Sequence, residues 1–216
     1  MNMVKQSKAK LATLNSKKAL EILVEGNHRF TQKKLDEHDR FIVRKELQSV
    51  QYPFASVLGC SDSRATPELI FDQNHGDIFS VRLAGNIATK EAIGSLEFST
   101  KYLGVKILVI LGHTNCGAVK AACDHFKGGN IGEIIDLIKP SVEAEKTITN
   151  GDKRNSQNKS FVNKVCMLNI KAQMKKIITE SSIIQNQIEE KQIGLVSAIY
   201  DLPTGHVHFD IDNAII

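Results

Sequence analysis

Apolar and polar residues alternate with two different periods along the first part of the chain. Apolar side chains recur at three- and four-residue steps in residues 17–32, which predicts an amphipathic helix. Helical spacing returns at 89–103 and at 116–126. Near-continuous apolar strands that alternate with helices are typical of a parallel sheet covered on both faces. Such strands, rich in strand-forming residues, are predicted at 54–59, 77–83 and 106–112.

After residue 128 the pattern becomes mainly helical. We predict helices at 130–146 and 160–180, separated by a polar surface loop at 149–159. The remaining predicted elements are a late strand, a turn and a final short strand, at 193–200, 203–205 and 207–211.

The whole pattern predicts one α/β domain over residues 1–216, with a mostly parallel β-sheet flanked by helices. Within it we distinguish an N-terminal helical arm (1–50), a core (51–128) and a C-terminal extension of helices and strands (129–216). The polar loop is too short to mark a domain boundary. A chain of 216 residues is long enough for one domain with a substantial core.

The composition is that of an ordinary globular protein, with 42% hydrophobic and 24% charged residues. The formal charge of +4 comes without a basic stripe interleaved with aromatic residues, so we expect no nucleic-acid partner. No apolar run reaches the roughly 18 residues that span a bilayer, and no apolar stretch follows the first charges. We therefore expect a cytoplasmic protein with no membrane partner and no disulfides. A solvated helix face or frayed tail is predicted for the lysine-rich start, Lys5, Lys8, Lys10, Lys17 and Lys18.

Cysteine placement is the most informative feature of the sequence. Cys60 directly follows one predicted strand, and His113 and Cys116 directly follow another. Neighbouring strands of a parallel sheet bring their carboxyl ends to one edge, so these clusters can converge. Thiolate and imidazole suit zinc, and a catalytic zinc site needs three protein ligands and one exchangeable position. Asp62 could take that fourth position or stand aside for water.

Each half of this pattern has a simpler interpretation. A lone cysteine at a strand end is usually a small buried residue, and a lone histidine there is usually hydrogen-bonded and inert. Both clusters together, each after an apolar strand, favour a metal site. A closed structural zinc site is an alternative, although it more typically uses two Cys-x-x-Cys pairs. Cys123 and Cys166 fall at apolar positions of predicted helices, where we expect core packing.

Two short segments together resemble the signature of a known family. Residues 60–64 (CSDSR) and 113–117 (HTNCG) are similar to the paired motifs of the β-class carbonic anhydrases, Cys-(Ser/Ala)-Asp-Ser-Arg and His-x-x-Cys-Gly. The resemblance extends over most of the chain and includes the flanking segments 20–30, 76–86 and 198–207.

The resemblance implies reversible hydration of carbon dioxide to bicarbonate and a proton. One Zn²⁺ per chain would be held by Cys60, His113 and Cys116, and zinc-bound water or hydroxide would be the nucleophile. Asp62 and Arg64 match the family's Asp–Arg dyad. In that dyad the carboxylate orients the nucleophile, and the two-pronged guanidinium holds the carboxylate off the metal.

The resemblance also implies a substrate pocket. Gln51 matches the family's substrate-side glutamine by its spacing before the first zinc cysteine, and Gly85 matches a backbone position near the substrate. Phe79, Ala84 and Phe98 fall where the plant-like branch lines its pocket. That branch commonly has a tyrosine in place of Phe98 and a larger aliphatic residue in place of Ala84, so the shape of the pocket stays open.

A resemblance of this extent implies a homodimer built partly from exchanged N-terminal helices, with dimers often paired into tetramers. The apolar face at Leu20, Ile22, Leu23 and Phe30 fits such an exchange, although it could equally pack on its own subunit. Six histidines are candidates for proton export, although each fits an ordinary surface or structural role better. They are His28, His38, His75, His125, His206 and His208.

The fourth zinc position separates two branches of the family. One branch is switched off when the aspartate binds zinc, helped by bicarbonate at a pocket that includes a tryptophan. This chain has no tryptophan, Val57 stands where one would be expected, and Gln51 marks the plant-like branch. We therefore predict an open site near neutral pH, with Asp62 paired to Arg64.

Two other functions stay open at this point. The first is a thiol protein that senses zinc or redox state without turnover. The second is a related lyase that uses the same fold on a carbon disulfide-like substrate. A carbon dioxide hydration assay with and without a chelator separates the enzyme from the sensor, and a substrate panel separates the two lyases.

Overall fold

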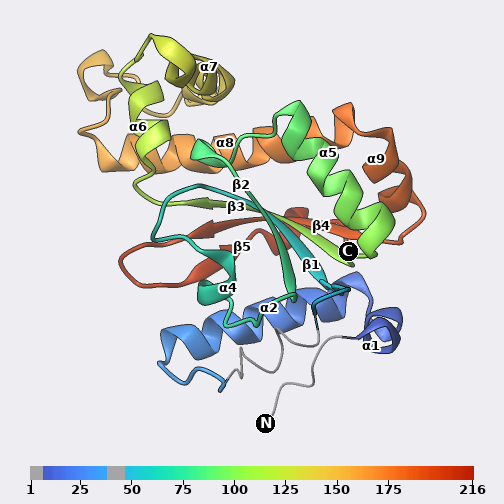
Figure 1. Cartoon of the computed structure of the whole chain (residues 1–216). Coiled ribbons are helices and arrows are strands. Elements are labelled where there is room, and N and C mark those ends of the chain that lie inside the picture. Colours follow the sequence, from blue (N-terminus) through green and yellow to red (C-terminus); the bar gives the residue numbers. More distant parts are fainter. Residues whose placement is uncertain (1–6, 38–46) are drawn as a thin grey trace.

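The protein is described by a computed structural model that covers residues 7–37 and 47–216, so Lys5 and His38 lie outside the described residues. Its centre is a five-stranded sheet in the order β2-β1-β3-β4-β5. The first four strands run parallel, whereas β5 pairs antiparallel with β4 at one edge (Figure 1). The strands are β1 (Ala55–Gly59), β2 (Ile78–Arg82), β3 (Ile107–His113), β4 (Gly194–Tyr200) and β5 (Val207–Phe209).

Helices cover both faces of the sheet (Figure 1). One face carries α5 (Lys90–Phe98), α6 (Gly117–Cys123), α7 (Gly129–Ala144), α8 (Lys159–Glu180) and α9 (Ser182–Glu189). The other carries α1 (Lys8–Thr13), α2 (Ser16–Thr31) and α4 (Pro67–Ile70). Each face of the sheet has its own hydrophobic core: the first core lies under α5–α9 and the second under α1, α2 and α4. Successive residues of a strand point to opposite faces, so Ile110 of β3 lies in the first core and Val109 in the second. Within the two described ranges, no helix combines the length and apolar character needed to cross a bilayer.

The predicted mostly parallel α/β sheet is confirmed, and each predicted strand is present. The short helices α1, α4 and α9 were not predicted, because segments of four to eight residues show too few helical turns for a clear period. Two predicted helices end early. The one at 116–126 is α6, which stops before His125 takes a left-handed backbone with φ of 55°. The one at 89–103 is α5, followed by a π-helical turn over Ser99–Leu103.

The apolar face of α2 packs on the sheet of its own chain. Leu20 and Leu23 are buried in the second core, and Ile22 and Phe30 pack against it from partly buried positions. Of the two alternatives for this face, the structure therefore has packing on its own subunit.

The helix α2 approaches the end of α4 so closely that a side chain at Gly26 would not fit. A Cβ atom there would lie 1.8 Å from the carbonyl oxygen of Phe71. The adjacent Asn27 is buried and makes use of this approach. Its Nδ2 donates to the carbonyl oxygens of Ile70 (3.0 Å) and Gly205 (2.9 Å), and its Oδ1 accepts from a backbone N–H of β5 (2.8 Å). One amide thus ties α2 to α4 and to the β4–β5 turn.

Substituting Gly26 should reverse the usual effect of alanine in a helix. Helix propensity alone favours alanine by about 1 kcal/mol, but the clash with Phe71 should make Gly26→Ala destabilising by about 1–3 kcal/mol. Gly94→Ala in α5 is the matched control, because a Cβ atom there meets nothing within 4 Å, and it should stabilise by about 0.5–1 kcal/mol. Urea unfolding at fixed protein concentration measures both. Equal stabilisation by the two variants would contradict the close approach.

Candidate metal centre

The three candidate ligands lie where the strand order reverses. The chain leaves β1 toward β2 on one side, and β3 pairs with the other side of β1. A crevice opens at the carboxyl ends of two strands at such a point, and ligands of open α/β sheets bind there. Cys60 follows β1 directly and His113 is the last residue of β3, while Cys116 caps the start of α6.

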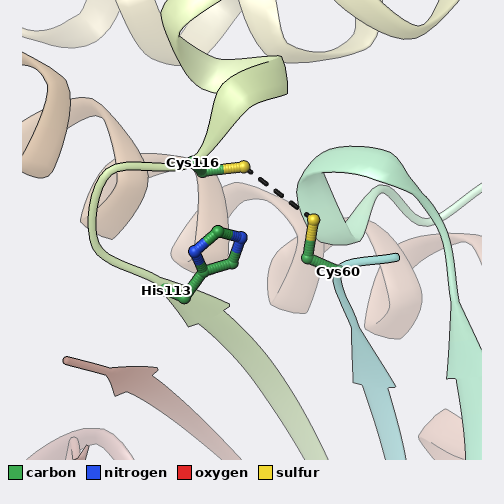
Figure 2. Close-up of side chains that lie close together, drawn as sticks. All are labelled: Cys60, His113 and Cys116. Carbon is green, nitrogen blue, oxygen red and sulfur yellow. Dashed lines mark hydrogen bonds between the residues drawn. The ribbon is translucent and has the colours of Figure 1, made fainter. Parts of the chain in front are cut away.

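The side chains of Cys60, His113 and Cys116 converge in this crevice (Figure 2). All three residues are buried, and their candidate ligand atoms lie within 4.8 Å of one another. The two sulfur atoms are 3.9 Å apart. Two sulfurs bound at about 2.3 Å to one tetrahedral zinc ion lie about 3.8 Å from each other. The residues present therefore fit a single zinc ion.

The imidazole of His113 is oriented for a ligand role. Its Nδ1 lies 3.0 Å from the carbonyl oxygen of Thr114, and because a carbonyl only accepts, Nδ1 carries the hydrogen. Nε2 is then the atom with the free lone pair, and it is buried without a hydrogen-bond partner. A buried, unpartnered nitrogen costs free energy unless something binds it. A metal ion between this nitrogen and the two sulfurs would remove that cost.

The thiols of Cys60 and Cys116 share a proton through a hydrogen bond. The hydrogen bond from Cys116, supported by one from the Gly85 N–H, lowers the pKa of Cys60 to about 4 in spite of burial. The same bond and burial raise the pKa of Cys116 above its usual value. Burial by itself would lower the pKa of His113, but its contacts with the Cys60 sulfur raise it. The lowered pKa of Cys60 favours its thiolate, which is the form of cysteine that binds metal ions.

Asp62 and Arg64 form a two-pronged ion pair beside the cluster. Arg64 Nε donates to Asp62 Oδ1 (2.9 Å) and Nη2 donates to Oδ2 (2.8 Å). This hydrogen bonding from Arg64 holds the pKa of the Asp62 carboxyl well below its usual range. Asp62 Oδ2 also lies 3.8 Å from His113 Nε2. The carboxylate is therefore ionised, turned toward Arg64 and close to the position that a metal would take.

A further arginine fixes the loop that carries these residues. Arg82, at the end of β2, donates from Nε to the carbonyl oxygen of Cys60 (3.0 Å) and from Nη2 to that of Asp62 (2.6 Å). Arg82 is not among the site residues predicted from the sequence. The only signal was its place at the carboxyl end of the strand next to β1, and that place does not identify a partner.

The predicted substrate-binding residues do not all lie together in the structure. Gly85 lies at the cluster, because its N–H donates to Cys60 Sγ (3.3 Å). The rings of Phe79 and Phe98 lie 6.3 Å apart, and Phe98 is 46% exposed. Ala84, half-buried, precedes Gly85 in a short 3₁₀ turn. Gln51 is exposed and lies before β1, whereas the cluster follows β1, so the structure does not bring it to the three ligands within one chain.

A cavity of about 530 Å³ opens beside the centre. It reaches Arg64 of the ion pair and the loop between His113 and Cys116, and Arg64 is the only lining residue that the sequence predicted as part of the site. The described candidate histidines for proton export do not line it. Its lining residues are Arg64, Thr114, Asn115, Lys159, Asn163, Tyr200, Asp201, Leu202 and Pro203.

The fold and the cluster define a class of protein with an α/β sheet that could hold one metal ion on two cysteines and a histidine at its strand switch point. The sequence model of the family described as "Carbonic anhydrase" matches residues 55–207. The chain therefore belongs to the carbonic anhydrase family, and its likeness to a solved β-carbonic anhydrase at 26% identity places it in the β class.

Individual relatives agree with this assignment. The chain is 38% identical over 130 residues to "Carbonic anhydrase 2" of Mycobacterium tuberculosis, a match that covers 57% of the chain and 63% of that relative. The chain thus spans less than two thirds of the length of that curated relative. The β-carbonic anhydrase CafA of Aspergillus fumigatus matches with a TM-score of 0.68 and 26% identity, over 89% of each chain. A tetrameric β-carbonic anhydrase of Sordaria macrospora matches with a TM-score of 0.67 and 22% identity, over 90% of this chain and 98% of that one.

Removal of one cluster sulfur should abolish zinc binding, whereas removal of another buried sulfur should not. We expect one zinc per chain in the unmodified protein and none in Cys116→Ser, because a site with two remaining ligands loses most of its affinity. Cys123→Ser is the matched control, since Cys123 is also a buried free thiol but lies outside the cluster. Elemental analysis of the purified proteins measures the ratio. Full zinc content in Cys116→Ser would contradict the cluster.

Proposed function

We propose that the protein is a carbonic anhydrase that interconverts carbon dioxide and bicarbonate at one zinc ion held by Cys60, His113 and Cys116. The observation that carries this proposal is the free, buried lone pair of His113 Nε2, which faces two sulfurs 3.9 Å apart. Membership of the carbonic anhydrase family supports the reaction. Zinc, when bound, supplies a Lewis acid that can bring the pKa of a water ligand close to 7.

Asp62 is proposed to orient the reacting water. An ionised carboxylate only accepts hydrogen bonds, so Asp62 can fix the direction of a water O–H and leave an oxygen lone pair free for carbon dioxide. Its Oδ2 lies 3.8 Å from His113 Nε2, which puts it within reach of a molecule at the centre of the cluster. The depressed pKa of Asp62 keeps it in the accepting form throughout the neutral range.

Arg64 is proposed to keep Asp62 available for that role. A carboxylate this close to a cation would otherwise bind it and close the site. Both Asp62 oxygens are already hydrogen-bonded to the Arg64 guanidinium, and the backbone N–H of Arg64 also donates to Oδ1 (3.0 Å). The planar fork of arginine makes both side-chain bonds at once, which the single ammonium group of lysine cannot do.

The apolar walls for carbon dioxide are proposed to come from Phe79, Ala84 and Phe98. Carbon dioxide carries no net charge, so a small apolar pocket suits it better than a polar one. Gly85 is proposed to lie next to the substrate through its backbone, and Gln51 to hydrogen-bond the product. Because Gln51 lies before β1 and apart from the ligands of its own chain, its role is the least supported of these.

We also propose a cytoplasmic homo-oligomer, a dimer or a tetramer. All four cysteines are free thiols in the structure, as a reducing compartment would keep them. The ring of Phe98 contacts that of Tyr102 at 5.4 Å, and Tyr102 is largely exposed. An exposed aromatic surface of this kind favours association.

Sedimentation tests the assembly directly. At micromolar concentration we expect a species of at least twice the mass of the 23.9 kDa chain, because burial of the exposed aromatic surface removes apolar area from water. A monomer that persists across a tenfold range of concentration would contradict the oligomer and would leave the zinc site untouched.

Substitution of Arg64 should lower activity without loss of zinc. We expect Arg64→Ala and Arg64→Lys to reduce kcat/KM for carbon dioxide hydration by about 10- to 100-fold, because misplacement of a catalytic group costs that much. Stopped-flow hydration assays with zinc content measured in parallel would show this, and a chelator should abolish activity in the unmodified protein.

Lys18→Ala is the matched control for this test. Lys18 also pairs with a carboxylate, Glu21, and its side chain is 55% exposed against 56% for Arg64. The exposed pair at Lys18 is worth little, so this variant should keep full activity. Equal activity in Arg64→Ala and Lys18→Ala would refute the proposed role of Arg64.

A further inference from the structure

Two amide side chains of α8 are buried in the apolar core behind the metal centre. Asn169 has no exposed surface and Gln173 is 3% exposed. They stand four residues apart and so share one face of the helix. Apolar neighbours on the same helix, Val165 and Ile170, belong to the first core. Because an amide buried among apolar groups costs free energy unless its polar atoms are bonded, the partners of this pair identify what the amides hold.

The amide pair holds the turn that follows β2. Gln173 Oε1 accepts from the backbone N–H of Ala88 (2.8 Å), and Gln173 Nε2 donates to Asn169 Oδ1 (3.0 Å). Asn169 Nδ2 in turn donates to the carbonyl oxygen of Gly85 (2.9 Å). Two hydrogen bonds therefore run from the helix to the backbone of residues 85–88, and a third links the two amides.

Gly85 links the amide pair to the candidate metal ligands through its two backbone hydrogen bonds. Its carbonyl oxygen is bonded to Asn169, while its N–H donates to Cys60 Sγ (3.3 Å). Its φ of +73° is in the left-handed region that glycine tolerates, and a Cβ atom would come within 2.6 Å of Ile138. Asn169 holds the carbonyl group of Gly85 in place, so it also restricts the direction in which the Gly85 N–H points.

We propose that Asn169 and Gln173 are positioning residues that aim the Gly85 N–H at the Cys60 sulfur. This hydrogen bond would reduce the electron density that the thiolate donates to zinc. The inference rests on the proposed zinc site. A hydrogen bond to a thiolate stabilises its lone pairs, so the sulfur gives up less electron density and the metal keeps more positive charge. The amides thereby set the strength of the Lewis acid as well as the place of a ligand.

A purely structural role for the amides makes a different prediction. If the pair only fastens α8 to the turn, its loss should lower stability and leave the metal centre as it was. If the pair aims the N–H, its loss should change the electronic properties of the metal–thiolate bond. A spectroscopic readout separates these two roles, because a stability measurement alone moves in both cases.

The test uses the protein with cobalt(II) in place of zinc. In Asn169→Leu, which keeps the size of the side chain but removes its donor, the sulfur-to-cobalt charge-transfer band should move to longer wavelength. Ile177→Ala is the matched control: Ile177 is a fully buried residue of α8 with no polar side-chain atom, so it should lose stability with an unchanged band.

A second variant keeps the test decisive if Asn169→Leu fails to fold. Gln173→Met removes the bond that orients Asn169 and should shift the band in the same direction by a smaller amount. Bands at the position of the unmodified protein in the variants that fold would overturn the inference. A failure of the unmodified protein to bind cobalt or zinc at all would instead overturn the proposed zinc site.

Discussion

The parallel pairing of β1 and β3 across the strand switch point is the constraint on which the candidate metal centre depends. The connection after β1 turns toward β2, whereas β3 pairs with the opposite side of β1. The carboxyl ends of β1 and β3 are therefore neighbours with no crossing connection between them, and a crevice opens there. Cys60 and His113 lie on opposite sides of this crevice, which brings together residues 53 positions apart in sequence.

Contacts with backbone groups then fix the direction of two of the candidate ligands. The Thr114 carbonyl oxygen holds His113 through Nδ1, and the Gly85 N–H meets the sulfur of Cys60. Arg82 binds the carbonyl oxygen of Cys60. These contacts come from the end of β2, the turn after it and the connection after β3, and they leave the lone pair of Nε2 free. The centre is accordingly a product of the sheet topology and of the loops that leave it, more than of side chains adjacent in sequence.

The sequence was sufficient to predict the sheet, because β1, β3 and β4 are buried on both faces and read as continuous apolar runs. It also pointed to the convergence of Cys60, His113 and Cys116, since thiol and imidazole after successive strands share an edge. It could not identify Asn169 or Gln173. An amide among the polar residues of an amphipathic helix looks solvated, and its burial follows only from how α8 lies on the sheet. Gln51 shows the opposite problem: the sequence predicted a site role for it from its spacing before Cys60, but spacing does not determine where a residue before β1 lies.

Zinc K-edge X-ray absorption of the purified protein tests the central claim most directly. The claim is that the switch point between β1 and β3 assembles a site of two sulfurs and one imidazole. The spectrum should then show two sulfur scatterers at about 2.3 Å and lighter nitrogen or oxygen scatterers at about 2.0–2.1 Å, with the multiple scattering of a single imidazole. A first coordination sphere of three or four sulfurs, or one with no sulfur, would contradict it.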